Sequence, residues 1–276
     1  MTFLCAPATD IMCFGCCPPI RPAHYDHLDY VGSLRREFMD NRIAFLRDRP
    51  RYRPIRGYSC WALGFLDVTG RKVGCLLHPQ FNKGEDLRHL IDYGNKCRRE
   101  SCSAAQVFAL LPPEGQDFLL PLVRGMNSFY FSSPKANPLF HLLLWGPEVL
   151  EPLRVWADSM DWAVTELIYH QPFLLEPVWK PKAHRYLFRL MLPHAGPSNS
   201  DGKALSECCT ELLGRILSLQ DLGQTGKEAG GIYTHLLPLP HDFLDFLRLG
   251  LGLGRCSLYR ARELDIRAQV LASEVS

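Results

Sequence analysis

The chain has 276 residues, of which 47% are hydrophobic and 22% charged, enough to bury a core without covalent crosslinks. Its formal net charge of +2 is far from the strongly basic balance of a dedicated nucleic-acid binder. No charge-free run approaches the ~20 residues that a membrane-spanning helix needs, so we expect no membrane partner.

The N-terminal residues 1–7 lack the basic segment and long apolar stretch of a signal peptide, so we expect a cytoplasmic protein. Thiols stay reduced in that compartment, where clustered cysteines are more often metal-binding or catalytic than disulfide-bonded. The chain has eleven cysteines, and an odd number suits a closed disulfide framework poorly.

The first part of the chain is predicted to be irregular. Residues 1–23 are rich in turn formers, and helical spacing of apolar residues begins at His24 and continues to Leu46. An Arg/Pro loop follows over residues 47–59. Asp67-Val-Thr-Gly70 is a turn signal between two short predicted strands, Trp61–Leu66 and Lys72–Leu77. Residues 78–102 are predicted to be irregular, with one helical turn near Asp86–Asp92.

After Pro112-Pro113 the sequence changes character. Thiols become sparse and Leu/Phe-rich segments with helical periodicity appear, over residues 139–144, 147–170, 204–219 and 242–262. We therefore predict a mainly α protein with two domains. Residues 1–110 form a small irregular and β module rich in cysteine, and residues 111–276 form a helical domain whose role the sequence does not indicate.

The cysteines are distributed unevenly, since eight of the eleven fall within the first 102 residues. In Cys13-Phe-Gly-Cys16 two thiolates can point at one ion, because Gly15 relieves the backbone at the bend. The candidate metal ligands are Cys13, Cys16, Cys17, Cys60, Cys75, His78, Cys97 and Cys102, with Cys5 as the alternative to His78. Eight ligands would fill two four-coordinate sites; four would fill one and leave the others structural. Soft thiolate sets select zinc or an iron–sulfur cluster.

The order of these motifs resembles a known family. Cys13-Phe-Gly-Cys16-Cys17 is followed by Cys60-Trp-Ala-Leu-Gly-Phe-Leu-Asp67, then by Gly74-Cys75-Leu-Leu-His78-Pro79, Cys97-Arg98 and Cys102. This is similar to the zinc- or iron-chelating cysteine-cluster domain, a group that includes flagellin N-methylase-like proteins. The resemblance covers residues 5–105 and implies metal binding. It departs from the family pattern at Asp10, where the first cysteine of the opening motif is expected.

Two classes of function remain open. The first is an accessory or interaction protein whose N-terminal module is stabilised by a metal, because metal-binding free energy becomes folding free energy in such modules. The alternative is an iron–sulfur enzyme for electron transfer or protein methyl transfer; the sequence identifies no catalytic residue for it. The basic residues of the segment Arg42–Arg56 form a candidate surface for a protein partner or an anionic ligand, and we do not expect nucleic acid there.

Overall fold

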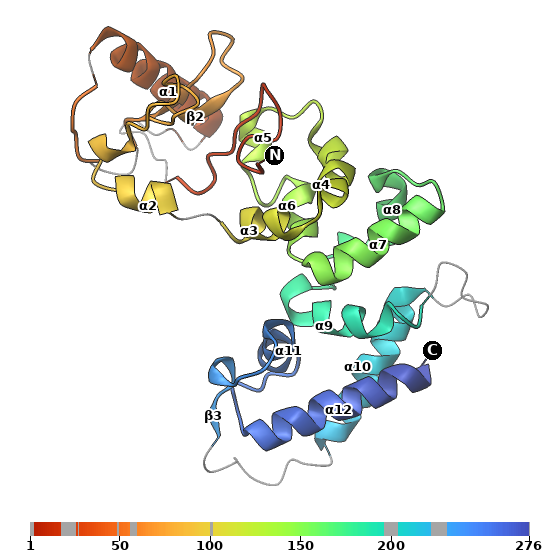
Figure 1. The fold of residues 1–276 in the computed structure, drawn as a ribbon. Coiled ribbons are helices and arrows are strands. Elements are labelled where there is room, and N and C mark those ends of the chain that lie inside the picture. The colour runs from red at the N-terminus through yellow and green to blue at the C-terminus, as the bar shows by residue number, and fades with distance from the viewer. Residues whose placement is uncertain are drawn as a thin grey trace. The chain divides into compact units, whose positions relative to one another are not determined.

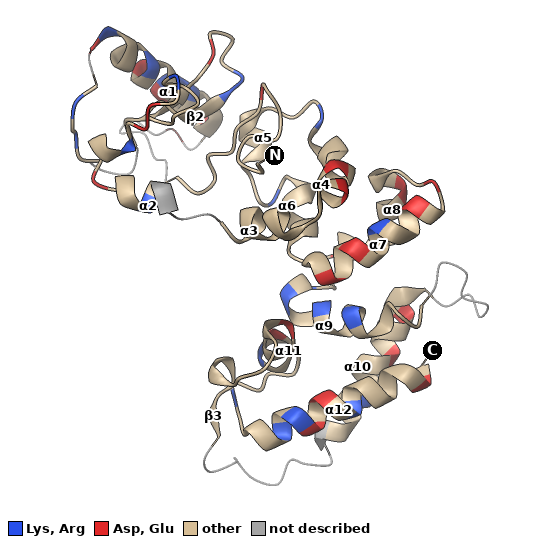
Figure 2. Cartoon of the chain, in the orientation of Figure 1, with Lys and Arg blue, Asp and Glu red and all other residues tan. Residues whose placement is uncertain are grey.

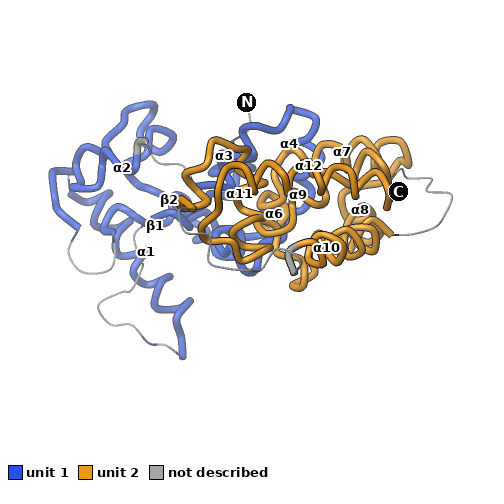
Figure 3. The backbone as a smooth tube through the Cα atoms, turned by 90° about the horizontal axis from the view of Figure 1, so that it is seen from below, with its two compact units in different colours: residues 1–140 blue, residues 141–276 orange. Residues whose placement is uncertain are grey.

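The structure, a computed structural model, describes residues 3–17, 26, 28–48, 50–55, 60–99, 102–195, 204–221 and 231–275. Its internal contacts divide the chain into two units, Met1–Phe140 and His141–Ser276 (Figures 1 and 3). The described residues are mainly helical, as predicted. The division falls later than the predicted boundary after residue 110, because three short helices follow the cysteine-rich segment within the first unit.

In the first unit the elements are α1 (Tyr30–Arg47), β1 (Leu63–Phe65), β2 (Val73–Cys75), the 3₁₀ helix η1 (Arg88–Leu90), α2 (Gly94–Arg99), α3 (Ser103–Leu110), α4 (Pro113–Leu119), η2 (Leu120–Val123) and α5 (Ser128–Phe131). α6 (Pro138–Leu143) runs across the division. The second unit contains α7 (Pro147–Ser159), α8 (Val164–His170), η3 (Pro172–Leu174), α9 (Pro181–Met191), α10 (Leu205–Asp221), β3 (Ile232–Tyr233), η4 (Thr234–Leu236), α11 (His241–Asp245), the π-helix η5 (Phe246–Gly250), β4 (Arg255–Cys256) and α12 (Leu258–Val275).

The helix α1 begins where Asp29 accepts a hydrogen bond from the amide of Gly32 at 3.1 Å, which satisfies one of the free N–H groups of the first turn. It packs closely on β1. A Cβ on Gly64 would lie 3.0 Å from the carbonyl oxygen of Phe38, so only glycine permits this approach. Arg42 then donates to the carbonyl of Phe65 at 2.8 Å, which fixes the helix along the strand.

The two predicted strands form an antiparallel hairpin in which Leu63 pairs with Cys75 and Phe65 with Val73. The carboxylate of Asp67 closes the turn by accepting hydrogen bonds from Thr69 Oγ1 and from the amides that lead into β2. Gly70 has φ +67°, a left-handed conformation that favours glycine. The strand prediction is thus confirmed, although both strands are shorter than predicted.

The irregular N-terminal loop is anchored to the hairpin by α5. The hydroxyl of Ser128 is buried and accepts hydrogen bonds from the amides of Met12 at 3.2 Å and Val73 at 3.1 Å. The hydroxyl of Ser132 accepts from the amide of Phe14 at 2.9 Å. Two serines more than a hundred residues along the chain therefore hold the backbone on either side of Cys13.

An aromatic cluster fills the core of the first unit. The ring of Phe38 is fully buried and lies between 5.7 and 5.9 Å from the rings of Phe14, Phe65 and Phe129. These residues come from the N-terminal loop, α1, β1 and α5, so the cluster joins all four segments. Edge-on and offset contacts of this kind add to the free energy of burying the rings.

The second unit is organised around α9, whose apolar face is buried against α10, η5 and α11. Phe188 of α9 lies within 5 Å of the rings of Trp145, Phe173 and Trp179. Cys208, Cys209 and Cys256 are buried in the core of this unit.

Two predicted helical segments are interrupted. The segment 147–170 breaks into α7 and α8 at Asp161, which has φ +55° and cannot continue a right-handed helix. The segment 242–262 breaks after η5, where Gly252 has φ +71° and a short strand precedes α12. In the part of the chain that the structure describes, no helix has the length and apolar composition of a membrane span.

Candidate metal centre

All eleven cysteines lie within the described residues and none is in a disulfide, and the eight N-terminal ones differ in exposure. Cys5 and Cys16 are exposed, Cys60 is buried, and the remaining five are partly buried. Four of the N-terminal thiols belong to the aromatic core or pack against it, and the other four are not among its residues. We call Cys17, Cys60, Cys75 and Cys97 the inner thiol group and Cys5, Cys13, Cys16 and Cys102 the outer thiol group.

The inner thiol group lies at the edge of the aromatic core. Cys60 belongs to that core, and Cys17, Cys75 and Cys97 pack against it while partly exposed. Each reaches this place on a different element: the end of the N-terminal loop, the turn before β1, β2 and α2. The carbonyl of Cys60 accepts a hydrogen bond from the amide of Leu63 at 3.0 Å, which folds that turn against the hairpin.

Burial and neighbouring thiols raise the pKa values of the inner thiol group. Burial, with a smaller contribution from Cys97, raises the pKa of Cys60 to about 11 and that of Cys75 to about 12. A hydrogen bond with Cys16, followed by burial, raises the pKa of Cys17 well above its ordinary value, and Cys75 and Cys60 add to that rise. Thiols act on one another in this way only at short range.

The outer thiol group is formed by the N-terminal loop and the start of α3. The amide of Cys13 donates to the carbonyl of Cys5 at 2.9 Å, which brings these two residues side by side. Burial raises the pKa of Cys5, and Cys16 and Cys102 raise it further. Burial likewise raises the pKa of Cys13 to about 11, although hydrogen bonds from the Gly15 amide and from Ser132 oppose the rise.

Cys16 connects the two groups. It raises the pKa of Cys13 and Cys5 in the outer thiol group and of Cys17 and Cys97 in the inner one. The Cys13-Phe-Gly-Cys16-Cys17 turn therefore supplies thiols to both groups, and a hydrogen bond between the side chains of Cys16 and Cys17 connects them. The sequence-predicted cysteines are thus brought into one region of the first unit.

His78 has other neighbours. Burial and the positive charge of Arg88 lower its pKa, while Asp86 opposes them. Its Nδ1 accepts a hydrogen bond from the amide of Gln80 at 3.2 Å, which closes a turn after β2. Cys5, the alternative that the sequence left open for the eighth group, is the residue whose electrostatic neighbours are thiols. Ligation by His78 stays a prediction.

Arg88 is the basic side chain that the sequence analysis overlooked. Its NH1 donates to the carbonyl of Cys97 at 3.0 Å, and its NH2 forms a 2.8 Å ion pair with Asp86. Its positive charge lowers the pKa of Cys75 and Cys97, against the larger effect of burial. The only sequence signal for this role is the Asp-Leu-Arg spacing, which is common in turns. The side chains of Arg98 and Arg99 lie outside the described residues.

The donor types suit a thiophilic metal, but the side chains do not form a ready coordination shell. Among the residues that the structure describes, no three His, Cys, Asp or Glu side chains are arranged so that they could hold one metal ion. The thiols share a region, whereas a bound ion requires them to share a point at about 2.3 Å from the metal. Metal binding would therefore require side-chain rotation and small movements of the loop.

Comparisons with protein-family models, with curated proteins and with solved structures give no match. The resemblance to the cysteine-cluster domain consequently stays a prediction that rests on its motifs.

Proposed function

We propose that the cysteine-rich segment of the first unit is a thiolate metal-binding module, which takes zinc or an iron–sulfur cluster. We further propose that the protein acts as an accessory or interaction protein stabilised by this metal. The observation that supports this best is that thiols from segments up to 97 positions apart in the chain raise one another's pKa, as Cys102 and Cys16 do for Cys5 and as Cys60 and Cys97 do for Cys75.

The physical argument is one of charge. Thiols that raise one another's pKa resist ionisation together, because each thiolate makes the next more costly. A bound cation reverses this effect, since it deprotonates its thiol ligands and compensates their charge. Arg88 supplies a single positive charge near the inner thiol group, which is too little for four thiolates.

Ligation requires the thiols to rearrange, because the described residues form no ready coordination shell. Cys16 is exposed, and the loop from Phe3 to Ile11 is formed of turns with isolated bridges rather than a continuous sheet. The inner thiol group is held by the hairpin and the aromatic core. We therefore infer that the inner group supplies the rigid half of the module and that the loop adjusts to it.

The test is metal content in single variants of the full chain purified without oxygen. Cys75→Ser removes a thiol of the inner group, and Cys16→Ser removes the exposed thiol that connects both groups. Cys208→Ser is the matched control, because Cys208 is a buried thiol in the second unit. We expect both N-terminal variants to hold less metal per chain and the control to match the unaltered protein.

Equal metal content in all three variants would contradict the ligand assignment. Cys16 is exposed, so its replacement tests ligation even if Cys75→Ser does not fold. Iron with acid-labile sulfide would identify a cluster and favour the enzyme alternative, whereas zinc alone would favour the structural role.

A further inference from the structure

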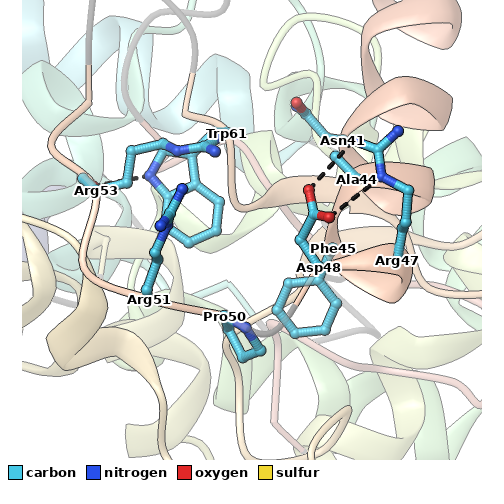
Figure 4. Close-up of a pocket in the computed structure, with 9 residues that line it drawn as sticks. All are labelled: Asn41, Ala44, Phe45, Arg47, Asp48, Pro50, Arg51, Arg53 and Trp61. Atoms are coloured by element: carbon cyan, nitrogen blue, oxygen red, sulfur yellow. Dashed lines mark hydrogen bonds and ion pairs between the residues drawn. The ribbon is translucent and has the colours of Figure 1, made fainter.

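A pocket opens beside the C-terminal end of α1, in the basic segment Arg42–Arg56. It has a volume of about 560 Å³ and lies within the first unit. Its walls come from α1, from the loop after it and from the residue after Cys60 (Figure 4). The lining residues are Asn41, Ala44, Phe45, Arg47, Asp48, Pro50, Arg51, Arg53 and Trp61. Arg49 and Arg56 lie outside the described residues.

Three arginines line this pocket and only one of them is neutralised there. Arg47 pairs with Asp48 at 3.2 Å, which holds the pKa of Asp48 below its ordinary value; Arg51 and Arg53 lower it further. In the described ranges, the guanidinium groups of Arg51 and Arg53 take part in no ion pair or hydrogen bond. The guanidinium groups of Arg51 and Arg53 therefore remain available to an anion. The partial negative charge at the C-terminal end of α1 offsets only part of their positive charge.

Arg53 is held in a defined orientation. Its guanidinium lies over the ring of Trp61, 5.4 Å from the centroid, and Trp61 Nε1 donates to the carbonyl of Arg53 at 2.8 Å. The amide of Arg53 donates in turn to the carbonyl of Leu90 at 2.9 Å. A guanidinium stacked on an aromatic face keeps its N–H edge free for an anion, and its preorganisation lowers the entropy cost of binding.

The remaining walls combine two apolar rings, those of Phe45 and Pro50, with Ala44 and the polar side chains of Asn41 and Asp48. In Figure 4, Arg51, Arg53 and Trp61 stand on one side of the pocket, with Phe45 and Asp48 opposite and Pro50 between the two sides. The amide nitrogen of Asn41 is engaged by the carbonyl of Leu63 at 2.9 Å, which leaves its oxygen as an acceptor. The volume falls in the range of small-molecule sites and exceeds what a bare phosphate ion fills.

We propose that this pocket binds a phosphate ester of nucleoside monophosphate size, with the phosphate on Arg51 and Arg53 and the ring system between Phe45 and Pro50. Arg is the side chain best matched to a phosphate, since its fork donates two parallel hydrogen bonds. The proposal does not depend on metal binding by the thiols, because no lining residue is a proposed ligand.

The test is titration of the full chain with the four ribonucleoside 5′-monophosphates, followed by calorimetry and by tryptophan fluorescence. Trp61 is the only tryptophan of the first unit, so its signal reports on the pocket. We expect at least one monophosphate to bind, and its nucleoside without the phosphate to bind at least about tenfold more weakly. Failure of all four to bind, or equal binding of nucleoside and nucleotide, would overturn the proposal.

Two variants locate the site. Arg51→Gln removes an exposed guanidinium of the pocket, and we expect a loss of affinity of about tenfold or more. Arg71→Gln is the matched control, an exposed arginine at the hairpin turn whose guanidinium makes no hydrogen bond or ion pair within the described residues. Equal affinity of the two variants would place the ligand elsewhere. The fluorescence change should disappear in Trp61→Phe, and its persistence would also contradict the site.

A nucleic acid is the competing source of phosphate. Short single-stranded RNA without terminal phosphates should bind more weakly than the monophosphate. Tighter binding of the RNA, with affinity that falls steeply as salt rises, would replace the small-molecule proposal with a nucleic-acid surface.

Discussion

His184 shows how a single side chain makes the stability of one unit depend on pH. It is partly buried at the start of α9, and its Nδ1 accepts a hydrogen bond from the amide of Lys180 at 3.0 Å. Burial, together with the charge of Lys180, lowers its pKa from the ordinary value of 6.5. Protonation removes the acceptor, so the folded state holds the neutral ring more firmly than the unfolded state does.

The sign of the effect follows from proton binding. As pH falls through 6.5 the unfolded state takes up a proton at this histidine before the folded state does, so stability falls as pH decreases from neutral through 6.5 towards the lowered pKa of the folded state. His184→Gln should reduce that slope for the second unit in urea unfolding followed by near-UV circular dichroism. An unchanged slope in the variant would show that His184 carries no part of the pH dependence.

At the same scale, the sequence suggests which thiols are candidate ligands but not which side chains contact them. The spacing of Cys13, Cys16 and Cys17 predicted a turn that brings thiols together, because short-range geometry suffices there. The eighth ligand could not be chosen between Cys5 and His78, since that choice depends on contacts between distant segments. Arg88 went unnoticed for the same reason: its hydrogen bond to the Cys97 carbonyl depends on the fold of residues 85–97.

At the scale of elements, the contacts of α5 extend the first unit beyond the predicted boundary. Ser128 and Ser132 connect this short helix to the N-terminal loop and to β2, so residues beyond the predicted boundary at 110 belong to the fold around the thiols. No sequence pattern distinguishes these two serines from surface ones, because each acts through a backbone amide far away in the chain. The hairpin, in contrast, was predictable from the turn Asp67–Gly70 that lies between its own strands.

Replacement of Ser128 by alanine tests this connection. The buried amides of Met12 and Val73 would both lose their acceptor, at roughly 1 to 3 kcal/mol each. We expect a clear loss of stability in the first unit by chemical denaturation, and lower metal content because the loop that carries Cys13 is released. Ser103→Ala, an exposed position at the start of α3, is the control and should stay within about 0.5 kcal/mol of the unaltered protein. Equal stability of the two variants would contradict the anchoring role.

At the scale of the whole molecule, charged residues occur in both units, whereas thiols near the surface occur in the first unit. Basic residues occur along α1 and the loop after it, on α9, which has no acidic residue of its own, and on α12, where acidic residues accompany them (Figure 2). In the second unit, ion pairs such as Arg185–Asp245 at 3.0 Å connect α9 to α11. Thiols near the surface occur only in the first unit, and Cys208, Cys209 and Cys256 are buried in the second.

The mainly helical class was predictable at this scale because it follows from hydrophobic periodicity, which is a local property. The division of the chain into two units was less predictable from the sequence. Periodicity marked the change of character near residue 112, whereas the structure divides the chain after Phe140, where contacts rather than composition change. The helix breaks at Asp161 and Gly252 were also not predicted from the sequence, since the apolar spacing continues across both positions.

The metal proposal is tested most directly by analysis of zinc, iron and acid-labile sulfide in the full chain purified without oxygen, with a count of reactive thiols before and after chelation. We predict at least one thiolate-bound metal or cluster per chain, and N-terminal thiols that become reactive only when it is removed. Metal-free protein whose exposed Cys5 and Cys16 react freely from the start would contradict the proposal.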